Sequence, residues 1–144
     1  LRMFELSNHE WEVLEELRNV LKILKDATLY FSCGSTYIPT KPMKELVYSI
    51  PNLASMIPAM DLMDREFTSY AHNPTYSAPI RAAIELAQKT LSCYYSSMDK
   101  SVLYHIAMAL HPRYKLTYFK NTCHSPTWIR NTEKLIRDKF EQSY

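Results

Sequence analysis

The stretch SNHEWEVLEELRNVLKILKDA, residues 7–27, decides the fold class of this chain. Ser7 followed three residues later by Glu10 is a capping box, which is typical of a helix N-terminus. Apolar residues then recur at the helical spacing of three and four: Trp11, Leu14, Leu17, Leu21 and Leu24, with Val13, Val20 and Ala27 beside them. We therefore predict a helix from about residue 8 to residue 30, with one apolar face and a solvated face that carries Glu12, Glu15, Glu16, Arg18, Lys22 and Lys25.

The helical period recurs along the rest of the chain, interrupted by prolines. Over residues 43–71 it predicts two helical pieces, because Pro51 and Pro58 each lack an N–H and clash with the preceding turn; the break should lie near Pro51. Thr40 can cap the first piece, with Pro42 in its first turn. Three further helices are predicted: from Ser77 and Pro79 to about Tyr95, over Val102–Leu110 with a stop at Pro112, and from Ser125 and Pro126 to near the end. Residues 32–42, 72–77 and 96–100 are predicted to be loops or breaks.

Gly34 is the only glycine in the sequence. A dinucleotide fingerprint or a P-loop needs several glycines, so both are excluded. Together with the helical period, this scarcity predicts an all-α fold, a multi-helix bundle of about five to seven helices. A length of 144 residues suits one domain, so we expect residues 1–144 to form a single helical domain.

Cysteine usage and hydropathy bear on the cellular compartment. Cys33, Cys93 and Cys123 are far apart and odd in number, which argues against a disulfide framework and favours a reducing compartment. No apolar run approaches the roughly 20 residues needed to cross a bilayer, and the first residues show no signal segment. Because the sequence begins with Leu1, we expect it to be an excerpt from a longer intracellular protein.

The two halves of the chain differ in charge. Residues 1–70 hold seven Lys and Arg against ten Asp and Glu, whereas residues 71–144 hold ten against five. The C-terminal half is therefore the candidate basic surface, although solvated helix faces also explain such a balance. Five tyrosines crowd this half and either stack on nucleic-acid bases or fill helix junctions: Tyr94, Tyr95, Tyr104, Tyr114 and Tyr118.

Residues that could carry chemistry are scattered. The adjacent Cys123 and His124 have no second pair to complete a metal site. We expect His105 to be a hydrogen-bonded or surface histidine, and nothing ties Cys33 to a base. Asp61 and Asp64 would share a helix face, where they could hold Mg²⁺ but are more simply solvated. We expect neither an independent enzyme nor a metal site.

One motif is more specific. Within residues 91–119, Tyr94 and Tyr95 precede a helix and a Leu-His-Pro-Arg-Tyr-Lys-Leu corner. This pattern resembles the Ala-x-x-Leu-(Asp/His)-Pro-Arg-x-Lys-Leu motif of hobo–Activator (hAT) superfamily DNA transposases, the fungal members most of all. The matching residues are Ala107, Leu110, His111, Pro112, Arg113, Lys115, Leu116 and Phe119.

Weaker signals extend the resemblance over most of the chain. Glu10-Trp11 resembles the Glu-Trp pair of these transposases, and residues 27–40 resemble their Ala-Thr…Pro-Thr loop. Downstream, Trp128-Ile129 and the final Phe140…Tyr144 resemble the Trp-Ile…Phe…Tyr pattern at the end of the same region in these transposases. Two stretches depart from the pattern: residues 88–93 lack a usual basic position, and residues 51–73 are rich in proline and methionine. These departures suggest a decayed or domesticated copy.

The resemblance implies a role without catalysis for this stretch. Such transposases have an RNase H-like domain whose two aspartates and one glutamate bind Mg²⁺, and a helical insertion separates the second aspartate from the glutamate. This chain resembles the insertion, so the catalytic carboxylates and the Mg²⁺ would belong to other parts of the parent protein. The resemblance also implies cut-and-paste transposition in the nucleus, DNA as partner, self-association of the parent, and no small-molecule substrate. The alternative is a domesticated, transposase-derived protein-interaction module without DNA binding.

Two sets of residues follow as candidates. The DNA-binding candidates are Arg113, Lys115, Lys120, Arg130 and Lys134. The structural candidates are Trp11, Ala107, Leu110, His111, Pro112, Leu116, Phe119 and Trp128. Because Pro112 ends a helix and leaves carbonyls unpaired, Arg113 and Lys115 stand near a negative helix terminus, where cations are favoured. That placement fits locking of the helix corner at least as well as phosphate contact, and Leu110 and Leu116 would anchor the corner in the core.

Overall fold

The computed structural model describes residues 5–33, 52–122 and 125–143, and within these ranges it contains six α-helices, one short 3₁₀ helix and no strand. The elements are α1 (Asn8–Cys33), η4 (Leu53–Ser55), α2 (Met56–His72), α3 (Ala78–Asp99), α4 (Val102–Leu110), α5 (Lys115–Asn121) and α6 (Pro126–Ser143). The predicted all-α fold of five to seven helices is confirmed. The predicted break at Pro51 and the predicted cap by Thr40 lie outside the described residues.

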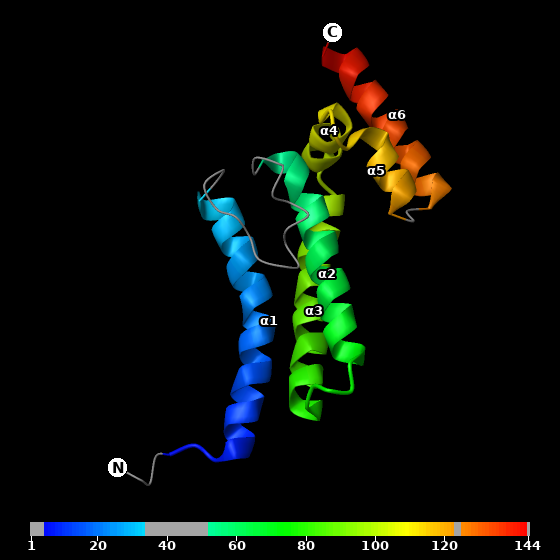
Figure 1. Ribbon diagram of the computed structural model, residues 1–144. Coiled ribbons are helices and arrows are strands. Elements are labelled where there is room, and N and C mark those ends of the chain that lie inside the picture. The colour runs from blue at the N-terminus through cyan, green and yellow to red at the C-terminus, as the bar shows by residue number, and fades with distance from the viewer. Residues whose placement is uncertain (1–4, 34–51, 123–124, 144) are drawn as a thin grey trace.

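The α2–α3 pair forms the centre of the molecule. The two helices run antiparallel, joined by the loop of residues 73–77 (Figure 1). Apolar positions three and four apart on α2, among them Ile57, Met60, Met63 and Phe67, belong to the same buried core as Ile80 and Ile84 of α3. The predicted loop after His72 is confirmed in its position.

Pro58 does not interrupt α2, contrary to expectation. The helix begins at Met56, so Pro58 occupies its first turn. Amides in the first turn of a helix have no intrahelical acceptor, and a missing N–H therefore costs nothing there. Just upstream, Asn52 and Ser55 form a reciprocal capping box that starts η4.

The long helix α1 lies alongside the α2–α3 pair (Figure 1). Its predicted capping box is confirmed: the Ser7 amide donates to Glu10 Oε2 at 2.7 Å, and the Glu10 amide donates to Ser7 Oγ at 3.3 Å. The helix buries Val20, Ile23, Ala27 and Tyr30 against its neighbours.

The single apolar face predicted for α1 is wrong in one respect. Trp11, Leu14, Leu21 and Leu24 are 60%, 41%, 50% and 39% exposed, so most of the residues that defined the pattern do not lie in the core. The residues predicted to lie beside them, Val20 and Ala27, are the buried ones. Leu24 borders the core face, because it lines an apolar groove with Met56 and Met98. Trp11, Leu14 and Leu21 form an exposed apolar side of the helix further from the core.

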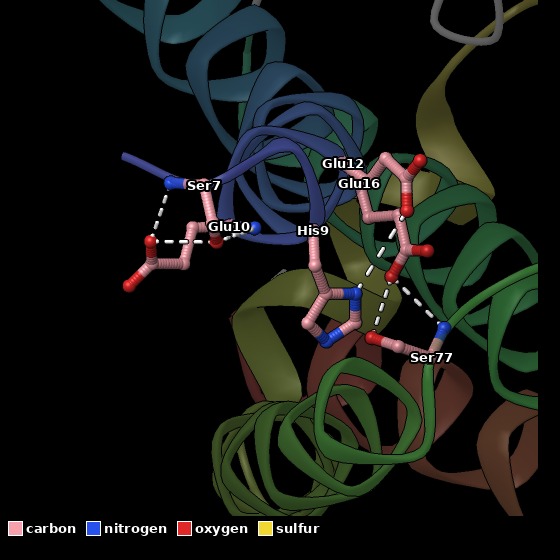
Figure 2. A network of polar contacts seen from close by, with 6 residues as sticks. All are labelled: Ser7, His9, Glu10, Glu12, Glu16 and Ser77. Carbon is pink, nitrogen blue, oxygen red and sulfur yellow. Dashed lines mark hydrogen bonds and ion pairs between the residues drawn. The ribbon is translucent and has the colours of Figure 1, made fainter. Parts of the chain in front are cut away.

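A polar contact fixes α1 to the start of α3. Glu16 Oε2 accepts hydrogen bonds from the Ser77 amide at 2.9 Å and from the Ser77 hydroxyl at 2.6 Å (Figure 2). Ser77 is the N-cap residue of α3, as expected, but its side chain does not cap that helix. Its hydroxyl donates to Glu16 of α1 instead. These two hydrogen bonds lower the pKa of Glu16, and a carboxylate at a helix N-terminus is favoured by the helix dipole.

The three remaining helices gather at one end of the α2–α3 pair (Figure 1). Helix α4 packs on η4 and α3, and α5 and α6 pack on α4 and on each other. Helix α3 continues through the predicted break at residues 96–99, and Lys100 is its C-cap. Helix α4 includes the apolar residues that marked it and ends before Pro112, as predicted. Helix α5 was not predicted. Helix α6 begins as expected at Pro126, and Ser125 Oγ accepts a hydrogen bond from the Trp128 amide at 3.2 Å.

Candidate functional site

The corner between α4 and α5 contains the motif on which the resemblance rests. His111 is the C-cap of α4, and its carbonyl accepts from the amides of Tyr114 and Lys115 at 3.2 Å each. The His111 ring lies against the Tyr114 ring, with centroids 4.6 Å apart, and Tyr114 is buried. Pro112 therefore follows the end of α4, as the sequence predicted, and the chain enters α5 a few residues later.

The anchors of this corner differ from those expected. Leu116 is half-buried and packs on the core, in agreement with its predicted role. Leu110 is 75% exposed, so its predicted burial is wrong. The buried side chains of this helix are His105 and Met108. The two residues from Met108 to Leu110 turn the side chain by roughly 200°, which places Leu110 on the side opposite Met108.

An aromatic cluster joins α4, α5 and α6. Phe119 is fully buried and lies 4.9 Å from the Trp128 ring, and the His105 ring stands edge-on to Trp128 at 5.1 Å. Asp99, at the end of α3, accepts from Trp128 Nε1 at 3.1 Å and lies 3.3 Å from His105 Nε2. Ala107 packs on the same core. These contacts fit the structural role predicted for Ala107, Phe119 and Trp128, and His105 is hydrogen-bonded as expected.

Asp61 holds a second junction. Its Oδ1 accepts from the Tyr95 hydroxyl at 3.0 Å and its Oδ2 from the Tyr118 hydroxyl at 2.6 Å, so α2, α3 and α5 meet at one carboxylate. Burial, and after it the adjacent Asp61 carboxylate, raises the pKa of both Tyr95 and Tyr118. Both oxygens of Asp61 are thus engaged by protein donors, whereas Asp64 on the same helix is exposed.

The tyrosines of the C-terminal half divide between the two interpretations. Tyr95, Tyr114 and Tyr118 fill helix junctions, because their rings pack on the core. Tyr104 is half-buried beside the same core, and Tyr94 is exposed. Base stacking is therefore an option for the exposed Tyr94 and not for Tyr95, Tyr114 and Tyr118, whose rings are engaged in the junctions.

The DNA-binding candidates are all exposed. Arg113 lies in the corner, Lys115 opens α5 and Lys120 lies in its last turn. Arg130 and Lys134 are four residues apart on α6 and so share a helix face. None of the five forms an ion pair with another residue in the described ranges, whereas Arg137 on α6 pairs with Glu133 at 2.8 Å. The cations of the corner and α5 are connected to those of α6 through the packing of α5 on α6.

Other polar groups give no catalytic arrangement. In the described part of the chain, no group of three or more His, Cys, Asp or Glu side chains is placed to hold a metal ion. Cys93 is a free, exposed thiol. The side chains of Cys33, Cys123 and His124, which the sequence raised as candidates, lie outside the described part.

The sequence did not single out the groups that organise this end of the molecule. The partners of Asp61 lie 34 and 57 residues away, and Trp128 reaches Asp99 across 29 residues. A helical period predicts which residues share a face of one helix, but such distant polar pairs have no local signal. The one available hint was the excess of tyrosine in this half.

Comparisons with known proteins give no relative: no protein-family model, no curated protein and no solved structure matches this chain. None of the helices in the described ranges is long and apolar enough to cross a membrane.

Proposed function

We propose that this chain is the non-catalytic helical part of a hAT-like DNA transposase and that it contacts DNA through the cations of its C-terminal helices. The observation that carries the proposal is the exposure of Arg113, Lys115, Lys120, Arg130 and Lys134 without ion-pair partners among the described residues. Residues 100–144 hold eight Lys and Arg against three Asp and Glu. Unpaired surface cations of this kind bind phosphate and release condensed counterions.

The corner motif supports the same proposal. Its residues form a rigid junction, with Tyr114 and Phe119 buried and Trp128 packed on Phe119, and a rigid junction holds nearby cations in fixed positions. Arg113 and Lys115 belong to that corner and Lys120 to the following helix. In this proposal the parent protein is nuclear and supplies the Mg²⁺-binding carboxylates from other segments, so this chain supports DNA binding and active-site assembly without bond cleavage of its own.

Salt dependence of DNA binding tests the proposal. If all five cations contact phosphates, the logarithm of the affinity should fall with the logarithm of salt concentration with a slope of about −4.5, a loss of roughly 500-fold between 50 and 200 mM. Replacing Arg130→Gln and Lys134→Gln together should weaken the slope by about 2. The matched control, Arg65→Gln with Lys89→Gln on α2 and α3, removes two exposed cations elsewhere and should leave the slope unchanged.

A domesticated protein-interaction module without DNA binding is the second candidate function. The exposed leucines of α1 favour it, because contiguous exposed apolar side chains mark interaction surfaces. Absence of DNA binding at low salt would overturn the first function and leave this one.

A further inference from the structure

Helices α4, α5 and α6 form a three-helix unit in which each helix packs on the other two. Met108, Phe119 and Trp128 bring one core side chain from each helix. Residues 122–125 connect the short α5 to the longer α6, and α6 lies at the outer edge of the unit (Figure 1). In helix-turn-helix proteins the second of two helices joined by a short turn enters the major groove of DNA. Helix α6 has the corresponding place in this unit.

Helix α6 has one face on the core and a polar face that turns away from it. Trp128, Ile129 and Thr132 lie on the core side. Four exposed residues at intervals of three, one and three form what we call the polar face of α6: Thr127, Arg130, Asn131 and Lys134. At about 100° per residue, the centre of the polar face lies roughly 160° round the helix axis from the centre of the three core residues. The polar face is therefore accessible to a partner without any change in the packing of α6.

The charges in the N-terminal half of α6 fit an anionic partner. Arg130 and Lys134 are exposed and form no ion pair among the described residues. The acidic side chain in this half, Glu133, is engaged by Arg137 at 2.8 Å. The N-terminal end of a helix also carries the positive end of its dipole. Both the side chains and the backbone thus attract phosphate to the first half of the helix.

The C-terminal half of α6 does not share this surplus of positive charge. Arg137 is paired with Glu133, and Lys139 lies about 130° round the helix from the centre of the polar face. Two exposed acidic side chains lie within about 30° of that centre, Asp138 and Glu141. They would repel phosphates, so contact with DNA is expected over the first turns of α6 and not beyond Lys134.

Asn131 supplies the chemistry of base recognition within this cationic surface. It is exposed, and its amide has no hydrogen-bond partner among the described residues. A carboxamide donates to N7 of adenine and accepts from its N6 amine at the same time, and this pair of groups is presented in the major groove. Thr127 lies one turn earlier on the same side of the helix, where its methyl group can contact that of a thymine.

We propose that the polar face of α6 lies in the major groove of duplex DNA, where Asn131 reads an adenine and the adjacent Arg130 and Lys134 bind phosphates. This inference rests on the proposed DNA contact and adds a sequence preference to it. The exposed Lys115 and Lys120 of α5 then contact the backbone, as the helix before a groove-bound helix does.

Selection of bound sequences from a pool of random duplexes by the full chain tests the proposal. The wild type should enrich a short motif that contains a fixed adenine. Asn131→Ala should lose this preference and bind the selected duplex about 5- to 150-fold more weakly. Its salt slope should stay unchanged, because no charge is removed. Gln142→Ala is the matched control, since it removes an exposed amide about three turns further along α6, and it should bind like the wild type.

A modified duplex tests whether Asn131 itself contacts the adenine in the major groove. 7-Deazaadenine lacks the N7 acceptor and keeps its Watson–Crick pairing. Placed at the fixed position, it should weaken binding by the wild type by at least about fivefold and leave binding by Asn131→Ala unchanged. An equal loss in both proteins would overturn the contact between Asn131 and the adenine.

The outcomes separate this inference from the DNA contact on which it rests. Salt-dependent binding without any enriched sequence, or an adenine preference that Asn131→Ala retains, would overturn base reading by α6 and leave the phosphate contacts standing. Absence of binding to any duplex at low salt would overturn both.

Discussion

Asp61 illustrates at the residue scale why a half-buried carboxylate is retained in a helical core. Its two oxygens are engaged by hydroxyls from α3 and α5, so the desolvated charge is compensated by two charge-assisted hydrogen bonds. Removing one partner of such a set leaves the other groups unsatisfied, which costs more than the hydrogen bond contributes net.

Asp61→Asn should therefore lower the free energy of unfolding by about 1–3 kcal/mol, since an amide nitrogen cannot accept from a second hydroxyl. Asp64→Asn is the control, because Asp64 is exposed and among the described residues accepts one long hydrogen bond, from Gln88 Nε2 at 3.4 Å. Urea denaturation measures both. Equal effects of the two substitutions would show that the tyrosine contacts do not stabilise the fold.

Lys115 is a second residue whose conformation predicts an effect. Its φ of 52° lies in the left-handed region, which is unfavourable for a residue with a Cβ. Lys115→Gly should raise the free energy of unfolding by about 0.5–1 kcal/mol, because glycine adopts this conformation without steric strain.

The matched control for Lys115→Gly is Lys134→Gly, an exposed position inside α6. Glycine there should lower the free energy of unfolding by about 1 kcal/mol, since no left-handed conformation offsets its poor helix propensity. Thermal or urea denaturation that finds both variants destabilised to the same degree would contradict the conformational argument at Lys115.

At the scale of the element, α1 is held by one apolar face and by the contact between Glu16 and Ser77. The lowered pKa of Glu16 gives this contact a pH dependence. A carboxylate whose pKa is lower in the folded state stabilises the fold above about pH 4.5, where a free glutamate titrates, and loses that effect as the pH falls through its folded-state pKa.

The melting temperature of the wild type should therefore fall more steeply than that of Glu16→Gln as the pH is lowered from about 5 to 3. Glu12→Gln is the control, because Glu12 is exposed and lies 3.8 Å from the exposed His9 ring, with no contact to α3 in the described residues. It should follow the wild type. Parallel curves for Glu16→Gln and the wild type would show that the Ser77 contact does not hold α1.

Helix boundaries are the part of the fold that the sequence predicts best. The Ser7–Glu10 box, the Ser125 cap and the stop before Pro112 all lie where local chemistry indicates, because capping acts within one turn. Ser77 also stands at the predicted N-cap position, although its side chain bonds Glu16 instead of capping α3. The faces that each helix buries were predicted less well. Leu110 and Leu21 are apolar in a helical period, yet both are exposed, because burial depends on neighbours far away in the sequence.

The sequence predicted which residues belong to the candidate site but not how the helices that carry them are arranged. The exposed state of the cations on α5 and α6 follows from their position among polar residues. Helix α5 itself was not predicted, because its seven residues are too few for a clear periodic signal. The contacts of Asp61 and Asp99 depend on tertiary packing and have no counterpart in local sequence.

At the scale of the whole molecule, two polar junctions connect the α2–α3 pair to the helices at its end. Asp61 ties α2 and α3 to α5, and Asp99 ties the end of α3 to α6. The first junction depends on protonated tyrosine hydroxyls whose pKa is raised, so it stabilises the fold fully below about pH 10 and loses that effect as the pH rises through the folded-state values.

The wild type should accordingly lose stability above about pH 10 more steeply than Tyr118→Phe, which has one fewer such hydroxyl. Tyr118→Phe should also be less stable at neutral pH, by about 1 kcal/mol, because Asp61 loses a donor. The control is Tyr94→Phe, an exposed tyrosine of α3, which should follow the wild type at every pH. Chemical denaturation at a series of pH values measures all three. Matching slopes for Tyr118→Phe and the wild type would contradict the role of this junction.

The two tryptophans lie at different places in this architecture. Trp11 is largely exposed on α1, whereas Trp128 is enclosed by Phe119 and His105 and hydrogen-bonded to Asp99. The chain therefore carries two built-in optical reporters in unlike environments, the first emitting at longer wavelength than the second. With Trp11→Phe the remaining fluorescence follows the junction of α4, α5 and α6 alone, and with Trp128→Phe it follows the outer face of α1. Fluorescence can thus monitor the junction of α4, α5 and α6 separately from the exposed side of α1, without an added label.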